Sequence, residues 1–338
     1  MKKAFFVLFV VTLALGLFVW KFKISEKVVR PLQENSTPSP KPLDKYTIET
    51  LAVTDMQPSP ITIGKTLSGS DDSEAYVFYY YVDNKRASGI LNIPKAPGSY
   101  PVIVMFRGYV DREQYSPGIG SQPSAQVFAK NGFITLAPDF LGYGESDNPS
   151  ASPIEERFQT YITATTLLAS VVNLNTAFET NNISVRVTPD KVGIWGHSNG
   201  GQIALTVLEI TGGTYPAVLW APVSKSFPYS ILYYTDEFDD QGKLLRKVVS
   251  DFEKDYDSDK YSLTNYFDRI NATIQIHQGG ADEEVPLKWS NNLTSTLKKL
   301  NKNVQYFTYD GANHNLQPTA WNTSVSRSLE FYKKSLNQ

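Results

Sequence analysis

The chain has 338 residues and no cysteine, and its 32 Lys and Arg against 34 Asp and Glu give a formal net charge of −2 at pH 7. This composition excludes disulfides, thiolate metal sites and a cysteine nucleophile, and a near-neutral chain without a basic block outside its N-terminus argues against nucleic acid as a partner. With 41% hydrophobic and 20% charged residues, the chain fits one large globular domain or two small ones.

The N-terminal residues have the pattern of a membrane segment. Residues 4–20 carry no charge and lie between Met1-Lys2-Lys3 and Lys21-Phe22-Lys23, and 17 such residues are near the lower limit for crossing a bilayer. The sequence after Ala14-Leu15-Gly16 stays apolar, which favours an uncleaved anchor over a cleaved signal peptide. We therefore expect a transmembrane signal anchor at residues 1–20 and an extracytoplasmic body, with secretion after cleavage as the alternative.

Composition also predicts the domain boundaries. Residues 21–45 hold four prolines among Ser, Thr and Lys, which is typical of a semi-extended linker. Residues 46–338 are expected to form the folded domain. Within it, residues 224–268 form a strand-to-strand connection that is much longer than the usual few residues, and we expect this insertion to be a small helical lid.

The folded domain begins with a β-rich pattern and continues with alternating strands and helices. Residues 61–63, 75–82 and 88–94 are typical of antiparallel strands. Short apolar runs that follow are typical of buried parallel strands, and helical stretches separate them. The expected strands are 102–106, 133–136, 192–195, 217–220, 274–276 and 304–307, and the expected helices are 124–131, 157–178, 202–210, 286–300 and 318–335. The pattern predicts an α/β fold whose mainly parallel sheet has helices on both faces.

The pentad Gly196-His197-Ser198-Asn199-Gly200 lies between an expected strand and an expected helix. A G-x-S-x-G in this context is typical of a nucleophile elbow. The turn is so sharp that the positions two residues before and two residues after the serine, here Gly196 and Gly200, must be glycine. The helix N-terminus beneath the hydroxyl favours developing negative charge. Ser198 is therefore the candidate nucleophile.

A serine hydroxyl needs a base to accept its proton, and the chain has three histidines. His197 is next to Ser198 on the turn, where consecutive side chains point apart. His277 ends an apolar strand, which favours a structural role. His314 lies in the loop between the last strand and the last helix, where a base can reach over the sheet edge, and it is the candidate base.

The base must in turn be oriented by a carboxylate. Asp282 comes directly after the expected strand at 274–276, and its rivals are Glu283, Glu284 and Asp310. Serine, acid and histidine at the ends of successive strands is the chain order of α/β-hydrolases. That order selects Asp282.

The tetrahedral intermediate needs two donors for its oxyanion. One is expected to be the backbone N–H of Asn199, which follows the nucleophile. The other is expected in Arg107-Gly108-Tyr109, where Gly108 lets the backbone approach the substrate and Tyr109 offers its N–H. No metal or cofactor is expected for this chemistry.

In this order the motifs resemble the α/β-hydrolase superfamily. The nearest resemblance is to the prolyl oligopeptidase catalytic domain and its dienelactone-hydrolase-like relatives, over roughly residue 76 to the C-terminus, and Gly108-Tyr109 is also similar to the acetyl xylan esterase group. Two departures are Arg107, where relatives often carry His, and an N-terminal part too short for the propeller of true prolyl oligopeptidases. The motifs are Phe106-Arg107-Gly108-Tyr109, Pro138-Asp139-x-x-Gly142-x-Gly144-x-Ser146, Gly196-His197-Ser198-Asn199-Gly200-Gly201, Gly280-x-Asp282-x-x-Val285-Pro286 and Gly311-x-x-His314.

The resemblance implies a serine hydrolase, and we predict a membrane-tethered enzyme that cleaves an ester or peptide bond through an acyl-enzyme on Ser198. A prolyl oligopeptidase-like peptidase and a carboxylesterase both remain open, as does an acetyl xylan or dienelactone-type esterase. The alternative from another class is a non-catalytic binding module displayed at the membrane. The aromatic side chains in the expected lid indicate an apolar pocket at the substrate entrance; they are Phe227, Tyr229, Tyr233 and Tyr234.

Overall fold

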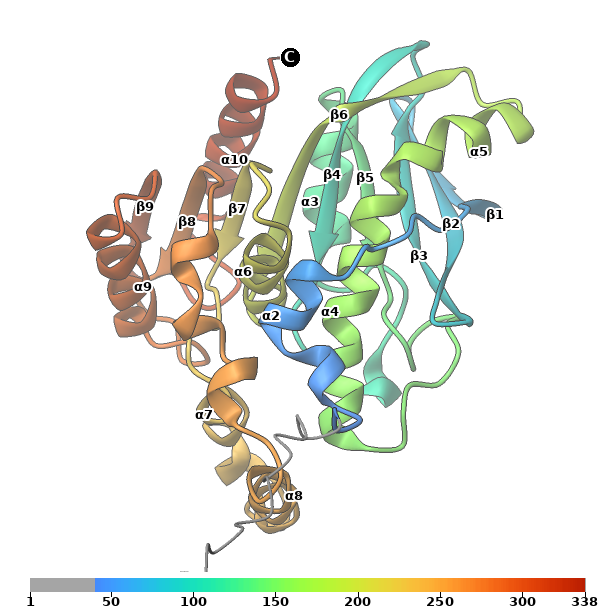
Figure 1. Cartoon of the computed structure of the whole chain (residues 1–338). Coiled ribbons are helices and arrows are strands. Elements are labelled where there is room, and N and C mark those ends of the chain that lie inside the picture. The colour runs from blue at the N-terminus through green and yellow to red at the C-terminus, as the bar shows by residue number, and fades with distance from the viewer. Residues whose placement is uncertain (1–39, 338) are drawn as a thin grey trace, which may run out of the picture. The chain divides into compact units, whose positions relative to one another are not determined.

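The computed structural model describes residues 40–337 (Figure 1). The compact unit begins at Pro42, a few residues before the expected boundary, because Leu43 already packs against the core and its carbonyl accepts from the Tyr261 hydroxyl. The expected anchor at residues 1–20 lies outside the described residues. Among residues 40–337, no helix combines the length and the apolar character that crossing a membrane requires.

A nine-stranded sheet runs through the described domain in the order β1-β2-β3-β5-β4-β6-β7-β8-β9. The first three strands pair antiparallel, and β3 pairs antiparallel with β5, whereas all pairs from β5 to β9 are parallel. This confirms the predicted fold class. The strands are β1 (Thr62–Gly69), β2 (Ser73–Val82), β3 (Lys85–Pro94), β4 (Gly98–Phe106), β5 (Ile134–Pro138), β6 (Val185–His197), β7 (Ala217–Trp220), β8 (Ile274–Gly279) and β9 (Val304–Tyr309).

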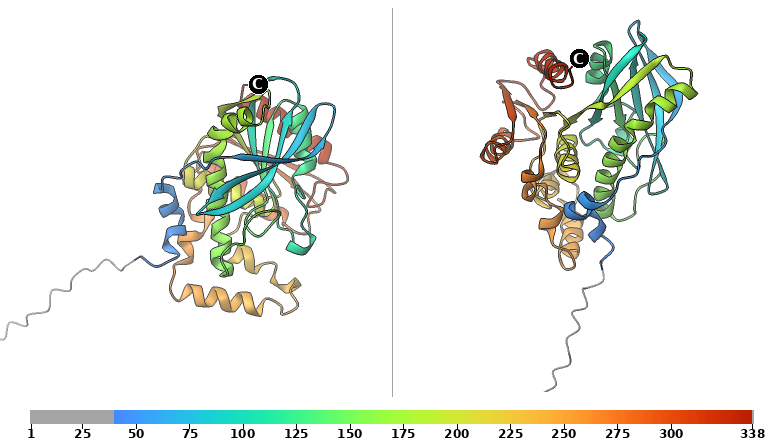
Figure 2. Two further views of the ribbon diagram at one scale, coloured as in Figure 1. Left: turned by 90° about the vertical axis from the view of Figure 1, so that its right-hand side faces the viewer. Right: turned by 45° about the horizontal axis from the view of Figure 1, so that its top comes forward.

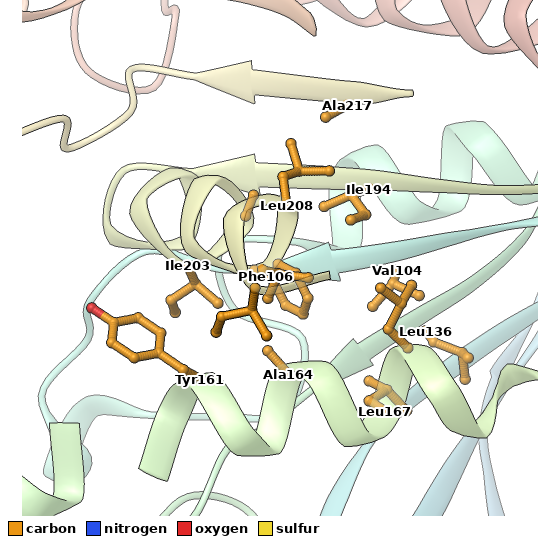
Figure 3. Packing of buried hydrophobic residues seen from close by; sticks show 14 of the residues in the cluster. Val104, Phe106, Leu136, Tyr161, Ala164, Leu167, Ile194, Ile203, Leu208 and Ala217 are labelled. Atoms are coloured by element: carbon orange, nitrogen blue, oxygen red, sulfur yellow. The ribbon is translucent and has the colours of Figure 1, made fainter. Parts of the chain in front are cut away.

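Helices cover both faces of the sheet because its central strands are apolar on both sides. In β4, Val104 and Phe106 belong to the core beneath α4 and α6 (Figure 3), and Ile103 and Met105 belong to the core beneath α3 and α10. Successive strand residues point to opposite faces of the sheet, so one continuous apolar run contributes side chains to the cores on both faces. The helices around the sheet are α2 (Ile48–Val53), α3 (Gln122–Lys130), α4 (Pro153–Ser170), α5 (Leu174–Thr180), α6 (Asn199–Thr211), α9 (Leu287–Lys299) and α10 (Trp321–Ser335).

The helix expected at 157–178 is two helices, α4 and α5, joined by a 3₁₀ turn at Val171–Asn173. The break lies where two polar side chains hold the segment before β1. The Ser59 amide donates to Ser170 Oγ at 2.8 Å, and Asn173 Nδ2 donates to the Ser59 carbonyl at 2.9 Å. Helix α4 also begins earlier than expected, at Pro153, because the Ser152 side chain caps it by accepting from the Glu155 amide.

Helix α2 was not expected from the sequence. Its six residues are too few to show a helical period, but Thr47 caps it and Ile48 and Leu51 are buried in the core. A short amphipathic turn of this kind is stabilised by the tertiary contacts of its apolar face rather than by its length.

The insertion between β7 and β8 is helical, as predicted, and lies at one end of the domain (Figure 2). It contains α7 (Tyr229–Leu232), α8 (Lys243–Glu253) and several 3₁₀ turns. Phe227, Phe252 and Tyr261 from this insertion are buried and pack with Phe158 of α4, with the Phe158 and Tyr261 ring centroids 4.6 Å apart. The insertion is therefore attached to the domain by a shared aromatic core.

Candidate active site

The turn between β6 and α6 forces Ser198 into an unusual backbone conformation. Ser198 has φ 57° and ψ −121° between a strand that ends at His197 and a helix that begins at Asn199. Positive φ is costly for a residue with a side chain, and such strain concentrates at functional sites. A Cβ added to Gly196 would lie 2.4 Å from the Gly200 carbonyl oxygen, and one added to Gly200 would lie 1.9 Å from the Phe106 oxygen. Both glycines are therefore required sterically.

The backbone of Ser198 is fixed on both sides. Its N–H donates to the Trp220 carbonyl at 2.9 Å, and its own carbonyl accepts from the amides of Val223 at 3.0 Å and Gly201 at 2.9 Å. These contacts tie the serine to the end of β7 and to the first turn of α6. The strained conformation is thus held by its surroundings.

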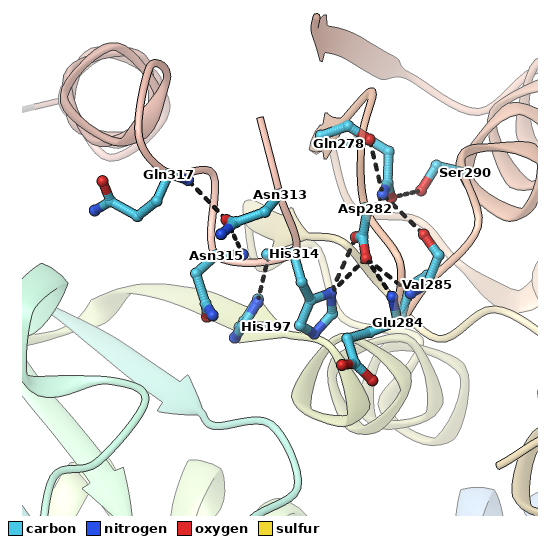
Figure 4. A network of polar contacts seen from close by, with 11 residues as sticks. His197, Gln278, Asp282, Glu284, Val285, Ser290, Asn313, His314, Asn315 and Gln317 are labelled. Carbon is cyan, nitrogen blue, oxygen red and sulfur yellow. Dashed lines mark hydrogen bonds and ion pairs between the residues drawn. The ribbon is translucent and has the colours of Figure 1, made fainter. Parts of the chain in front are cut away.

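Asp282 and His314 form a close pair at the ends of β8 and β9 (Figure 4). His314 Nδ1 lies 2.9 Å from Asp282 Oδ2 and 3.1 Å from Oδ1. A carboxylate can only accept, so Nδ1 carries the hydrogen and Nε2 is left with a lone pair. The Asp282 side chain is fully buried and that of His314 is 15% exposed. This is the arrangement that a general base and its orienting acid require.

Asp282 accepts further hydrogen bonds besides the one from His314. The amides of Glu284 and Val285 donate to Oδ1 at 3.0 and 2.9 Å, and Gln278 Nε2 donates to Oδ2 at 2.8 Å. Burial raises the pKa of Asp282, but the hydrogen bond and charge of His314 and the other donors outweigh burial, and the pKa is lowered. The carboxylate is therefore ionised at neutral pH.

Gln278 is a site residue that the sequence analysis missed. It is fully buried at the end of β8, and its Oε1 accepts from Ser290 Oγ at 2.7 Å, so its amide group has a fixed orientation. The available signal was a polar residue that ends an apolar strand directly before Gly279-Gly280. Without the fold, nothing in the sequence shows that this side chain reaches Asp282.

His197 supports the loop that carries His314. Its Nε2 donates to the His314 carbonyl oxygen at 3.1 Å, and the two ring centroids are 4.7 Å apart. Burial, followed by the nearby His314, lowers the pKa of His197 to about 4. His197 is therefore neutral above that pH, with Nε2 already used as a donor.

His277 is buried in β8 and points into a polar cluster away from Asp282. Its Nε2 donates to Gln275 Oε1 at 2.8 Å, and its Nδ1 accepts from the Tyr309 hydroxyl at 2.7 Å. Burial lowers its pKa to about 3, with a further contribution from Arg327. These contacts are those of a neutral structural histidine.

The two expected oxyanion donors approach Ser198 from different strands. Asn199 is the first residue of α6, where a backbone N–H has no acceptor within the helix. Gly108, just before Tyr109, lies so close that a Cβ on it would be 3.1 Å from Ser198 Cβ and 3.6 Å from Oγ. The Tyr109 side chain is 71% exposed and its hydroxyl donates to Asp111, so the backbone N–H is the part of Tyr109 expected to serve as the oxyanion donor.

The lid aromatics divide into two groups. Phe227 packs in the core and does not contribute to a pocket surface. Tyr229, Tyr233 and Tyr234 instead gather around Trp289 of α9, with the Tyr233 and Trp289 centroids 4.8 Å apart. Trp289 also packs with Val285, whose amide donates to Asp282, so this aromatic cluster adjoins the acid of the pair. Within residues 40–337 no group of three His, Asp or Glu side chains is arranged to hold a metal ion.

The sequence model described as "Prolyl oligopeptidase family" matches residues 121–338, more than half of the chain. The chain is also 27% identical over 274 residues to a protein of Bacillus subtilis named uncharacterized peptidase YtmA, a match that covers 79% of this chain and 96% of the relative.

Solved structures with the same fold include esterases and peptidases. An acetyl xylan esterase from Paenibacillus sp. R4 superposes with a TM-score of 0.57 at 18% identity, covering 84% of this chain and 91% of that one. Dipeptidyl peptidase 4 of Porphyromonas gingivalis gives a TM-score of 0.52 at 17% identity, covering 85% of this chain and 37% of that one. At these identities the likeness establishes the fold, and it does so equally for both enzyme classes.

Proposed function

Because the chain belongs to the prolyl oligopeptidase family, we propose that it is a serine hydrolase that cleaves ester or peptide bonds through an acyl-enzyme on Ser198. The observation that carries the proposal is the pairing of His314 with a buried, ionised Asp282, at the same sheet edge as a serine held at positive φ. Within residues 40–337, the hydrogen-bond partners of His197 and His277 include no carboxylate.

The residues have the following roles in the proposed reaction. His314 Nε2 removes the proton from Ser198 as Oγ attacks the carbonyl carbon, and Asp282 stabilises the imidazolium that forms. The amides of Asn199 and Tyr109 donate to the oxyanion. The imidazolium then gives its proton to the leaving alcohol or amine. Water, deprotonated by His314, attacks the acyl-enzyme carbonyl; the bond to Ser198 Oγ then breaks, the His314 imidazolium returns the proton to Oγ, and the acid is released.

We further propose that the substrate is a small ester or peptide rather than a folded protein domain. Relatives and structural neighbours include both a peptidase by name and acetyl xylan esterases. The aromatic cluster of Tyr229, Tyr233, Tyr234 and Trp289 beside Asp282 supports an apolar or aromatic group on one side of the scissile bond.

The test uses the full-length chain in detergent with a matched ester and amide of the same acyl group. Ser198→Ala and His314→Ala are expected to lower kcat by up to about 10⁶-fold, because the triad acts as a unit. A fluorophosphonate probe should label the wild type and not Ser198→Ala. His277→Ala is the control and should affect stability more than turnover per folded molecule. Full activity in His314→Ala would refute the proposal.

The ester and amide rates decide between the two enzyme classes. Serine-dependent amide cleavage would identify a peptidase, and ester cleavage alone would identify a carboxylesterase on a peptidase-like scaffold. Both outcomes are compatible with Ser198 as the nucleophile.

We also propose that residues 1–20 anchor the enzyme in a membrane, with the catalytic domain outside the cytoplasm. The support is the uncharged stretch at residues 4–20, which lies between Lys3 and Lys21. Membrane fractions should retain the chain after a high-salt wash, and protease added outside intact cells should remove the catalytic domain. Recovery of an uncleaved chain in the soluble fraction would contradict the anchor.

A further inference from the structure

Arg107 is buried beside Gly108 and the expected oxyanion donor Tyr109. It follows β4 directly, and only 6% of it is exposed. Its Nη1 donates to the Gly108 carbonyl at 2.8 Å, and its Nη2 donates to the Asp139 carbonyl at 2.9 Å. The guanidinium thus joins the loop after β4 to the loop after β5.

Aromatic rings hold the guanidinium in place. Its carbon lies 4.2 Å from the ring centroid of Tyr143 and 4.6 Å from that of Tyr115. The Tyr115 hydroxyl donates to the Asp139 carboxylate, which also accepts from Ser88. Stacking and hydrogen bonding together leave the planar group little freedom to rotate.

The hydrogen bond to Gly108 has a consequence for Tyr109. The Gly108 carbonyl and the Tyr109 N–H belong to one planar trans peptide and point in opposite directions. Whatever fixes the carbonyl therefore also fixes the direction of the N–H. A cation on the carbonyl polarises the peptide as well, which makes its N–H a stronger donor.

The same peptide lies against the nucleophile. Gly108 approaches Ser198 closely, and the carbonyls of Phe106 and Arg107 lie against Gly200 of the elbow. A rotation of the Gly108–Tyr109 peptide would thus displace a donor directly beside Ser198. In oxyanion sites, donors must be aimed before the charge develops.

We propose that Arg107 is a positioning residue, which holds and polarises the Gly108–Tyr109 peptide so that the Tyr109 N–H stabilises the oxyanion. This inference rests on the proposed serine hydrolase function. Arg107 touches no reacting atom in this role, since it acts on the substrate only through the peptide between Gly108 and Tyr109.

The test compares a 4-nitrophenyl ester with the corresponding thionoester, whose sulfur is a weak hydrogen-bond acceptor. Arg107→Met keeps an apolar side chain for stacking but removes both hydrogen bonds, and Arg107→Lys keeps the charge and one donor. We expect kcat for the ester to fall about 10- to 100-fold in Arg107→Met, less than the loss of a donor itself. The thionoester rate should fall much less, so the ester-to-thionoester ratio should fall, with Arg107→Lys intermediate.

Arg112→Met is the matched control. Arg112 belongs to the same loop region and also lies near the Tyr143 ring, but it pairs with Glu156 and does not touch Gly108. It should leave the ester-to-thionoester ratio unchanged. Thermal unfolding of each variant shows which variants are folded. If Arg107→Met does not fold, the test uses the ester-to-thionoester ratio of Arg107→Lys. A ratio in Arg107→Lys equal to that of the wild type would overturn the inference.

The outcomes separate this inference from the proposed function. If wild-type ester hydrolysis does not depend on Ser198, the proposed function fails. If it depends on Ser198 but folded Arg107 variants lose ester and thionoester activity equally, the function stands and Arg107 is only structural. A selective loss of ester turnover supports the positioning role.

Discussion

Two buried carboxyl groups in this domain have opposite surroundings. Asp282, at the end of β8, accepts from His314, from Gln278 and from two backbone amides. Glu209, in the last turn of α6, is fully buried, and neither of its carboxyl oxygens has a hydrogen-bond partner within residues 40–337. Arg269 approaches it but donates to the Glu209 backbone carbonyl at 2.8 Å.

The difference shows that burial alone does not produce a catalytic acid or base partner. Burial raises the pKa of both groups, and it dominates for Glu209, where the pKa is well above the usual value and the nearby Asp268 adds to the effect. At Asp282 the donors reverse the direction and the pKa is lowered. Asp282 keeps a negative charge that can stabilise an imidazolium, whereas the surroundings of Glu209 favour the protonated acid.

Between these two acids, the largest expected effect is that of Asp282→Asn. The amide is neutral, and its NH₂ group donates at a position where a carboxylate oxygen accepted, so the tautomer and orientation of His314 change and the charge is lost. We expect kcat to fall by about 10⁴-fold. Steady-state kinetics on the ester substrate measures this fall.

The matched variant is Glu209→Gln, which makes the same chemical change at the other buried acid. It should leave kcat within about twofold, because Glu209 has no contact with Ser198, Asp282 or His314. Equal losses of kcat in Asp282→Asn and Glu209→Gln would mean that turnover depends on buried carboxyl groups in general, rather than on the pair of Asp282 and His314.

A smaller effect is expected from Gln278→Met. The substitution removes the donor to Asp282 Oδ2 and leaves Ser290 without its acceptor. A hydrogen bond to a charged group contributes about 1.5–3 kcal/mol, and we expect part of this to appear in turnover as a loss of about 10-fold in kcat with little change in KM.

Gln275→Met is the control for Gln278→Met. Gln275 is a buried glutamine of the same strand, but it contacts His277 and Gln305. It should reduce stability without changing kcat per folded molecule. If kcat fell as much in Gln275→Met as in Gln278→Met, the loss would come from disturbing strand β8 and not from removing the donor to Asp282.

The contrast between these residues also shows what the sequence can predict. The positions of Ser198, Asp282 and His314 follow from local motifs at strand ends, because the parallel sheet brings strand ends to one edge whatever the details of packing. Their catalytic roles stay predictions. All nine strands overlap the expected ones because their apolar runs are short and bounded, but β1 ends six residues later than expected and β6 begins seven residues earlier.

The rest depends on contacts between distant residues. Gln278 and Arg107 act through partners that only the fold brings near, and helix α2 is too short for a period. Glu209 lies in a mostly apolar helix. The sequence pattern of a single acid in such a helix is the same whether or not its carboxyl group has a hydrogen-bond partner. Its lack of a partner can be read only from the packed structure.

The smallest expected effect concerns stability. Folded Glu209 keeps a proton that the unfolded chain releases above a pH of about 4.5, so this group lowers stability as pH rises from there. Asp282 has the opposite sign, because its lowered pKa contributes stability that is present at neutral pH and lost in acid. Relative to the wild type, Glu209→Gln should therefore gain stability as pH rises above about 4.5. The difference between Asp282→Asn and the wild type should instead change only in acid, around and below the ordinary carboxyl value of 3.8, where the wild type loses the contribution of the ionised carboxylate. Urea unfolding at several pH values measures both differences. If the difference in unfolding free energy between Glu209→Gln and the wild type did not change with pH, Glu209 would be ionised in the folded protein. The distinction between the two acids would then disappear.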